Sequence, residues 1–203
     1  SFSSSIARVL LGFSFANYFT TVGRLAPGYV IALLVVHRLS EEDGAYFYLS
    51  WTAVALLISI SYVISNVLVV QGSMTPLGVS KQTRIALLLS FAMLMPIVIT
   101  MFIFAETVLR VFGASYSEYA SGLLRLLVAS VPSIIIIQIY LGIQRIREGF
   151  KSLIAVPLFA TSGSVIGAYF VMPQYGLPGV GVVWLGIQTI TALLITPSLL
   201  SVL

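Results

Sequence analysis

Apolar runs of membrane-spanning length recur along the whole chain, and they limit what it can fold into. A helix needs roughly 20 apolar residues to cross the hydrocarbon core of a bilayer, and the sequence provides such runs between short polar or Gly/Pro-rich breaks. Only 8% of the 203 residues are charged and 59% are hydrophobic, whereas about 25% of the residues of a soluble domain are charged. The sequence therefore predicts an all-α membrane protein.

The breaks between the runs mark six expected transmembrane helices. Strands of a membrane β-barrel would alternate apolar and polar residues, but residues 54–58 and 134–137 are apolar without interruption. We therefore expect residues 1–203 to form a single bundle of six transmembrane helices. The expected spans are 9–36, 45–70, 84–104, 122–142, 152–172 and 179–202.

The distribution of Lys and Arg indicates how the bundle is oriented. Six of these residues fall on the side that holds the N-terminus, and three fall on the other side. Cytoplasmic loops are enriched in Lys and Arg, so we expect both termini to be cytoplasmic and the protein to lie in the cytoplasmic membrane. The six are Arg8, Lys81, Arg84, Arg145, Arg147 and Lys151, and the three are Arg38, Arg110 and Arg125.

Arg24 is the exception among the basic residues because it falls inside an expected span. Neither 9–23 nor 25–36 is long enough to cross alone, so shifting the span does not remove the charge from the membrane. Placing Arg at mid-bilayer costs about 2.5–3.5 kcal/mol, and such residues usually face a bundle interior or a watery cavity. Two roles are open: contact with an anionic ligand such as a phosphate, or a structural pair with helix-end carbonyls or Glu106.

Polar side chains also recur at helical spacing on several expected helices. Asn17 and Thr21 fall on the same face as Arg24. Such groups form helix–helix hydrogen bonds more often than ligand contacts, but together they would also suit a polar lumen that accepts sugar hydroxyls. The candidate substrate-binding residues are Arg24, Asn17, Thr21, Tyr62, Asn66, Gln138 and Gln188.

Two further features bear on mechanism and position. Five of the six expected helices contain a proline, which removes a backbone hydrogen bond and tends to kink the helix, and this favours a transporter over a passive anchor. Tyr46, Tyr48 and Trp51 lie near one expected membrane boundary, as an interfacial aromatic belt or a glycan-stacking surface. The prolines are Pro27, Pro96, Pro132, Pro157 and Pro197.

Several function classes are disfavoured by what the chain lacks. It has no Cys and one His, so disulfides, thiolate chemistry and a histidine metal cluster are excluded. No Asp or Glu falls in the middle of an expected span, so there is no obvious carboxylate for proton or sodium coupling. Basic residues form no nucleic-acid patch, and no phosphate-binding Walker loop is present. We expect no catalytic site, no metal and no cofactor.

Several short motifs of the kinds found at turns and at membrane boundaries follow one another between about residues 20 and 195. Residues 112–116 form a Phe-Gly-x-x-Tyr turn before the Leu-rich segment 123–127, and residues 175–181 form a Tyr-Gly-Leu-Pro-Gly turn region. Their order and spacing resemble those of polysaccharide-biosynthesis flippases of the multidrug/oligosaccharidyl-lipid/polysaccharide exporter superfamily. The other segments that carry the resemblance are 44–48, 65–66, 71–73, and Tyr140 with Arg145.

The resemblance is to the second six-helix half of such proteins, which carry twelve to fourteen helices in two bundles around a central cavity. It implies alternating access for a lipid-linked oligosaccharide, with Arg24 as a candidate phosphate contact. The partners expected are this lipid-linked glycan, membrane lipids, and either a missing N-terminal half or a second copy. Ser1 in place of an initiator Met favours a longer parent chain.

Three other functions remain open on the sequence. One is a cation-coupled drug antiporter of the same superfamily, which the absence of mid-membrane carboxylates disfavours. Another is a non-transporting membrane scaffold in cell-envelope glycan assembly. The last, an integral-membrane glycan polymerase or ligase, is disfavoured because no acid/base constellation stands out.

Overall fold

The structure is a computed structural model that describes the backbone of residues 4–74 and 78–203, and the side chains of residues 18, 20–23, 25–72 and 78–203. Nearly all of these residues are helical, and no strand occurs among them. The prediction of an all-α fold is therefore confirmed. The helices are α1 (Ser4–Arg38), α2 (Glu41–Met74), α3 (Val79–Ile103), α4 (Ala105–Arg110), α5 (Ala114–Ala129), α6 (Val131–Ile146) and α7 (Phe150–Leu200).

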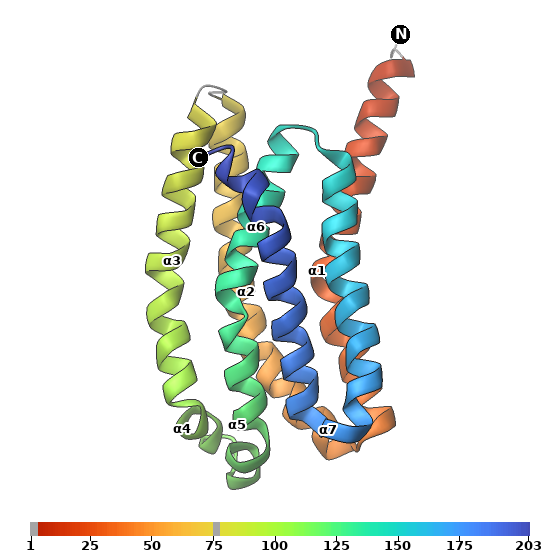
Figure 1. The fold of residues 1–203 in the computed structure, drawn as a ribbon, viewed down its shortest axis with the longest axis vertical. Coiled ribbons are helices and arrows are strands. Elements are labelled where there is room, and N and C mark those ends of the chain that lie inside the picture. Colours follow the sequence, from red (N-terminus) through yellow and green to blue (C-terminus); the bar gives the residue numbers. More distant parts are fainter. Residues whose placement is uncertain (1–3, 75–77) are drawn as a thin grey trace.

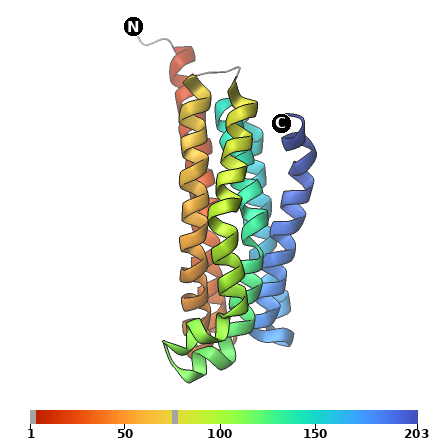
Figure 2. The same cartoon turned by 90° about the vertical axis from the view of Figure 1, so that its left-hand side faces the viewer.

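The long helices run up and down along one common axis (Figures 1 and 2). The first turns of α1 and the last turns of α7 lie at the same end of the bundle. The link between α1 and α2, the short helix α4 and a sharp bend in α7 lie at the opposite end. This arrangement corresponds to an even number of passes through the bundle.

Helix α7 is two antiparallel arms joined at Gly176. This residue has φ 58° and ψ −148°, a conformation outside the helical region that glycine adopts without steric cost. Pro173 and Pro178 flank it, and each lacks the N–H that a continuous helix would need. The first arm, 150–175, therefore runs toward the end of the bundle that holds the α1–α2 link, and the second arm, 177–200, runs back toward the end that holds the start of α1.

The expected helix over 122–142 is built differently from a single straight span. Helix α5 begins earlier, at Ala114, and a break at Ser130 separates it from α6. Pro132 sits in the first turn of α6, where its missing N–H costs nothing. The hydroxyl of Ser130 donates to the carbonyl of Leu127 at 2.6 Å and satisfies one of the carbonyls at the end of α5.

The exterior of the bundle is apolar, as a surface in contact with lipid requires. Four helical stretches among the described residues are long and apolar enough to cross a membrane: 41–72, 79–103, 114–146 and 150–200. Large apolar side chains on different helices point outward, and a surface of this kind is rare on soluble monomers. The chain is therefore a multi-pass membrane protein. Examples of these exposed side chains are Leu33, Val63, Leu88, Phe170 and Leu194.

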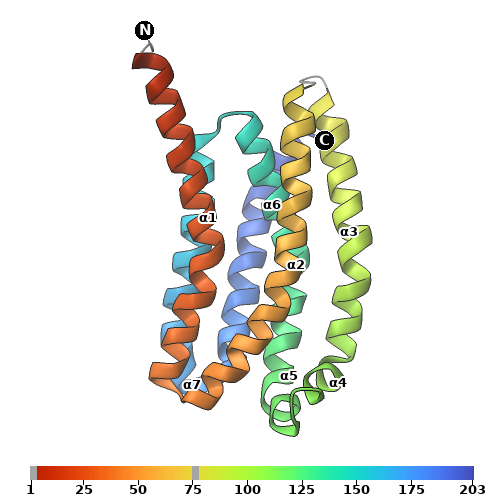
Figure 3. The ribbon, with the colours of Figure 1, turned by 180° about the vertical axis from the view of Figure 1, so that it is seen from behind.

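Helices α5 and α6 form the centre of the bundle, and α3 lies at its periphery. In the most apolar part of 114–146, 72% of the residues are buried, against 22% for α3. Helix α6 packs against α2, α3 and α7, and Figure 3 shows it behind the α1–α2 pair. Polar groups on α6 therefore face other helices.

Helices α2 and α6 pack closely against each other at Gly142. A Cβ atom there would lie 2.5 Å from the hydroxyl oxygen of Ser65 and 3.3 Å from its carbonyl oxygen. The Ser65 hydroxyl in turn donates to the backbone carbonyl of Gln138 at 2.6 Å. Small residues allow membrane helices to pack at such distances without a hydrophobic driving force between them.

Candidate functional site

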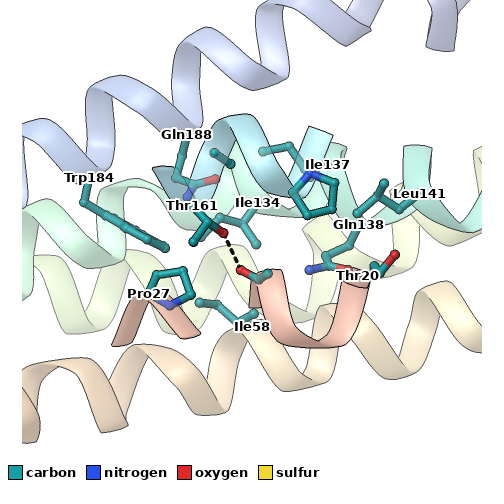
Figure 4. A pocket seen from close by; sticks show the side chains of 13 residues that line it. Thr20, Pro27, Ile58, Ile134, Ile137, Gln138, Leu141, Thr161, Trp184 and Gln188 are labelled. Atoms are coloured by element: carbon teal, nitrogen blue, oxygen red, sulfur yellow. Dashed lines mark hydrogen bonds between the residues drawn. The ribbon is translucent and has the colours of Figure 1, made fainter. Parts of the chain in front are cut away.

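A small, mostly apolar cavity with a few polar groups lies inside the bundle where α1, α2, α6 and both arms of α7 meet (Figure 4). Its volume is about 50 Å³, which is enough for ordered water but not for a sugar ring. Its polar lining comes from Thr20, Gln138, Thr161 and Gln188. The remaining lining is Gly23, Pro27, Ile58, Ile134, Ile137, Leu141, Pro157, Ala160 and Trp184.

The two buried glutamines bring amide groups from separate helices to this cavity. Gln138 on α6 and Gln188 on the second arm of α7 are each only 6% exposed. The Oε1 atom of Gln138 accepts no hydrogen bond from any described residue. A buried polar atom without a partner is unfavourable, so this oxygen is an acceptor suited to a water molecule or another donor in the cavity.

Two threonines of the cavity wall hold α1 and the first arm of α7 together. Thr20 donates its hydroxyl to the carbonyl of Leu153 at 3.1 Å. Thr161 donates its hydroxyl to the carbonyl of Gly23 at 2.8 Å, the bond dashed in Figure 4. Both bonds cross between helices. The sequence alone gives no reason to pair Thr20 with Leu153 or Thr161 with Gly23.

The remaining candidate residues are distributed as follows. Tyr62 and Asn66 are half-buried on α2. Among the described residues, α2 lines the cavity with Ile58 and not with Tyr62 or Asn66. Thr21 is half-buried beside Thr20. The backbones of Asn17 and Arg24 are part of α1, but their side chains lie outside the described residues. The structure thus brings Gln138 and Gln188 together.

Arg145 is a buried cation that the sequence reasoning assigned to a loop. Helix α6 continues to Ile146, so Arg145 lies in its last turn and is only 8% exposed. Its guanidinium carbon lies 5.6 Å from the centroid of the Tyr62 ring, within the range of a cation–π contact. The spacing of seven residues from Gln138 puts both on one helix face, which is the signal that could have identified it.

A second concavity of about 240 Å³ lies on the outside, between α1 and α2. Tyr29, Tyr48 and Trp51 line it together with Thr52 and Ser59. The two helices meet at their link and diverge toward the other end, as Figure 3 shows from behind. We call this concavity the α1–α2 groove.

The aromatic residues expected at the membrane boundary fall into different environments. Tyr46 is buried, with its ring centroid 5.0 Å from Tyr116 and 5.8 Å from Tyr119. Trp51 is half-buried and makes an edge contact with Trp184 at 4.8 Å. Tyr48 is exposed. Tyr46 is therefore a core residue, and Tyr48 and Trp51 belong to the groove.

The charged groups at the end that holds α4 form a separate site. Glu106 makes an ion pair with Arg125 at 2.9 Å, and both side chains are partly exposed. Exposed ion pairs of this kind contribute little to stability. Among the described residues there is also no group of His, Asp or Glu side chains arranged to hold a metal ion.

Comparison with known proteins gives two structural matches. No protein-family model and no curated protein sequence matches the chain. The fold is similar to a structure described as MATE in the bent conformation, with a TM-score of 0.74, 17% identity, and 91% of this chain and 44% of that chain covered. It is also similar to a MOP superfamily transporter from Pyrococcus furiosus, with a TM-score of 0.78, 17% identity, and 94% and 44% of the two chains covered.

These matches define the class of the fold. The chain has the fold of roughly half of a MATE or MOP superfamily transporter, and it spans less than half the length of either solved protein. The prediction of a helical bundle equivalent to one half of a two-bundle transporter is therefore confirmed. At 17% identity the likeness concerns the fold.

Proposed function

We propose that the chain forms one half of a transporter that moves lipid-linked oligosaccharide or polysaccharide repeat units across the cytoplasmic membrane by alternating access. The observation that carries the proposal is the match of nearly the whole chain to less than half of each of two solved transporters. A second half, or a second copy of the chain, would face this one and complete the pathway. Both termini would then be cytoplasmic.

The placement of the acidic residues favours a glycan over a cationic drug as the substrate. Carboxylates inside membrane helices mark proton and ion pathways in carriers, whereas each of the six Asp and Glu residues of this chain lies in the first two turns of a helix or in a connection. The six acidic residues are Glu41, Glu42, Asp43, Glu106, Glu118 and Glu148.

The α1–α2 groove supplies a surface with the chemistry of sugar recognition. Its aromatic rings provide flat apolar faces with polar edges. Thr52 and Ser59 add hydroxyl oxygens to its lining, with their protons donated to carbonyls of α2. At about 240 Å³ the groove is larger than the internal cavity. We assign contact with the glycan to the groove and hydration of the bundle interior to the cavity.

Removing the gene that encodes this chain tests the proposal in cells. Lipid-linked glycan is expected to accumulate in the cytoplasmic leaflet, where it stays inaccessible to an externally added glycosidase in intact spheroplasts. Ethidium efflux is expected to stay unchanged. A loss of efflux with normal glycan exposure would instead identify a drug antiporter. Normal appearance of glycan units on the outer face, with defective assembly afterwards, would identify a scaffold.

A water-exposed groove is expected to make single cysteines there reactive. The chain contains no cysteine. In the variants Ser59→Cys, Thr21→Cys and Asn66→Cys, the introduced cysteine is therefore the only thiol of this chain that can react. We expect Ser59→Cys to react fastest with a membrane-impermeant maleimide, because Ser59 is exposed in the groove while Thr21 and Asn66 are half-buried.

Leu88→Cys is the matched control for this labelling. Leu88 on α3 is 70% exposed but belongs to the lipid-facing exterior. Maleimides react with the thiolate, which forms poorly without water, so Leu88→Cys is expected to react slowly in membranes despite its exposure. Equal protection at positions 59 and 88 would contradict a watery groove and favour the scaffold.

A further inference from the structure

Two of the prolines leave carbonyl groups without their helical donors inside the membrane. In an α-helix the N–H of each residue donates to the carbonyl four positions earlier, and proline has no N–H. Pro27 in α1 therefore leaves the carbonyl of Gly23 without its donor, and Pro157 in α7 leaves that of Leu153 without its donor. Within a bilayer no bulk water can satisfy either group.

Each of these two carbonyls receives a threonine hydroxyl from the other helix. Thr161 of α7 donates to Gly23 O at 2.8 Å, and Thr20 of α1 donates to Leu153 O at 3.1 Å. The exchange is reciprocal, because each helix supplies the donor that the proline of the other helix removed. Thr20 is only 3% exposed, so its bond is shielded from solvent.

The backbones meet at the same place. A Cβ atom on Gly23 would lie 2.6 Å from the Cβ atom of Pro157. Gly23, whose carbonyl lacks its helical donor because of Pro27, is thus also the residue on which Pro157 packs. Farther along the two helices, the guanidinium carbon of Arg38 lies 4.0 Å from the centroid of the Tyr169 ring. This contact joins α1 and α7 at the end of the bundle where α1 finishes.

We infer that each threonine hydroxyl replaces the N–H that the proline of the other helix lacks, and that these two exchanged bonds make α1 and the first arm of α7 move as one body. Separating the helices would expose both freed carbonyls and both hydroxyls at once, while their joint movement would expose none of them. If the chain transports by alternating access as proposed above, a bend at Pro27 has to carry the first arm of α7 with it. This replacement of the missing N–H groups follows from the contacts and does not rest on the transported substrate.

A double-substitution cycle on the purified protein in detergent tests this inference. Thr161→Val keeps the side-chain shape and removes the donor, so we expect the melting temperature to fall by about 2–4 °C. Pro27→Ala restores a backbone N–H for Gly23 O. In the Pro27→Ala background, Thr161→Val is therefore expected to cause little or no fall. Thr20→Val and Pro157→Ala should show the same relation.

Three controls make the cycle specific. Thr161→Ser retains the hydroxyl and is expected to melt close to the parent protein. Thr196 is also half-buried but donates within its own helix, to Ala192 O at 2.7 Å. The effect of Thr196→Val should be the same with Pro or Ala at position 27, and so should that of Thr20→Val.

The decisive outcome is the coupling between Thr161 and Pro27. An equal loss of melting temperature from Thr161→Val with Pro or Ala at position 27 would overturn the inference, because the hydroxyl would then not be replacing the missing N–H. If Pro27→Ala does not fold, the same comparison between Thr20→Val and Pro157→Ala decides, together with retention of stability in Thr161→Ser.

Discussion

Replacing Gly142 with valine is expected to lower the free energy of unfolding by about 1–3 kcal/mol, the usual cost of overpacking a close-packed interior. The added Cβ would lie 2.5 Å from the hydroxyl oxygen of Ser65 and 3.3 Å from its carbonyl oxygen, so α2 and α6 would have to separate. The hydrogen bond from Ser65 to Gln138 O lies at the same contact and would be disturbed too. Thermal unfolding of the purified protein measures the loss.

Gly122→Val is the matched control for this prediction. A Cβ atom on Gly122 has no neighbouring atom within 4 Å, and both glycines are inside helices. The intrinsic helix propensity therefore changes equally in the two variants, and the difference between them isolates the contact of α2 with α6. Equal stability of the two variants would show that this contact is looser than the structure indicates.

If the chain transports a lipid-linked glycan as proposed above, replacing Arg24 with alanine is expected to reduce glycan export in cells strongly. A hydrogen bond to a charged group contributes about 1.5–3 kcal/mol, which corresponds to a loss of about ten- to a hundredfold in the rate of a step that depends on it. The expectation rests on the position of Arg24 in the long helix α1, just before the apolar stretch 25–38. The readout is the appearance of lipid-linked glycan on the outer face.

The conservative variant Arg24→Lys separates the phosphate role from a purely structural one. Lysine retains the charge but loses the planar guanidinium that contacts two phosphate oxygens, so partial export is expected. Membrane levels of both variants have to match the parent protein. Full export by the Arg24→Ala variant would show that Arg24 does not take part in transport.

Much of the fold follows from local sequence patterns. Apolar runs of spanning length predict helices because an unpaired backbone is too costly in lipid, and the helices found among the described residues agree with this expectation. Turn chemistry is also local, as at Gly176 between Pro173 and Pro178, where α7 reverses. The boundaries were harder to predict: Arg145 was assigned to a loop, yet it is buried in the last turn of α6.

The candidate site was predictable only in part. Gln138 and Gln188 could be singled out because buried amides are unusual in apolar helices, and both line the internal cavity. The sequence could not show that Tyr62 and Asn66 lie away from it, since helical spacing defines a face but not the neighbour of that face. Tyr46 likewise belongs to a residue type that is enriched at membrane boundaries, but it packs against Tyr116 in the core.

The sequence by itself determined that this chain is a helical membrane protein with prolines inside its helices, because apolar length and the missing N–H of proline are local properties. Only the tertiary structure decided what satisfies the carbonyls that two of those prolines release. Thr20 and Leu153, and Thr161 and Gly23, are far apart in the chain and become partners only where α1 packs against α7. A hydrogen bond between helices depends on their relative rotation and depth, which no local pattern specifies.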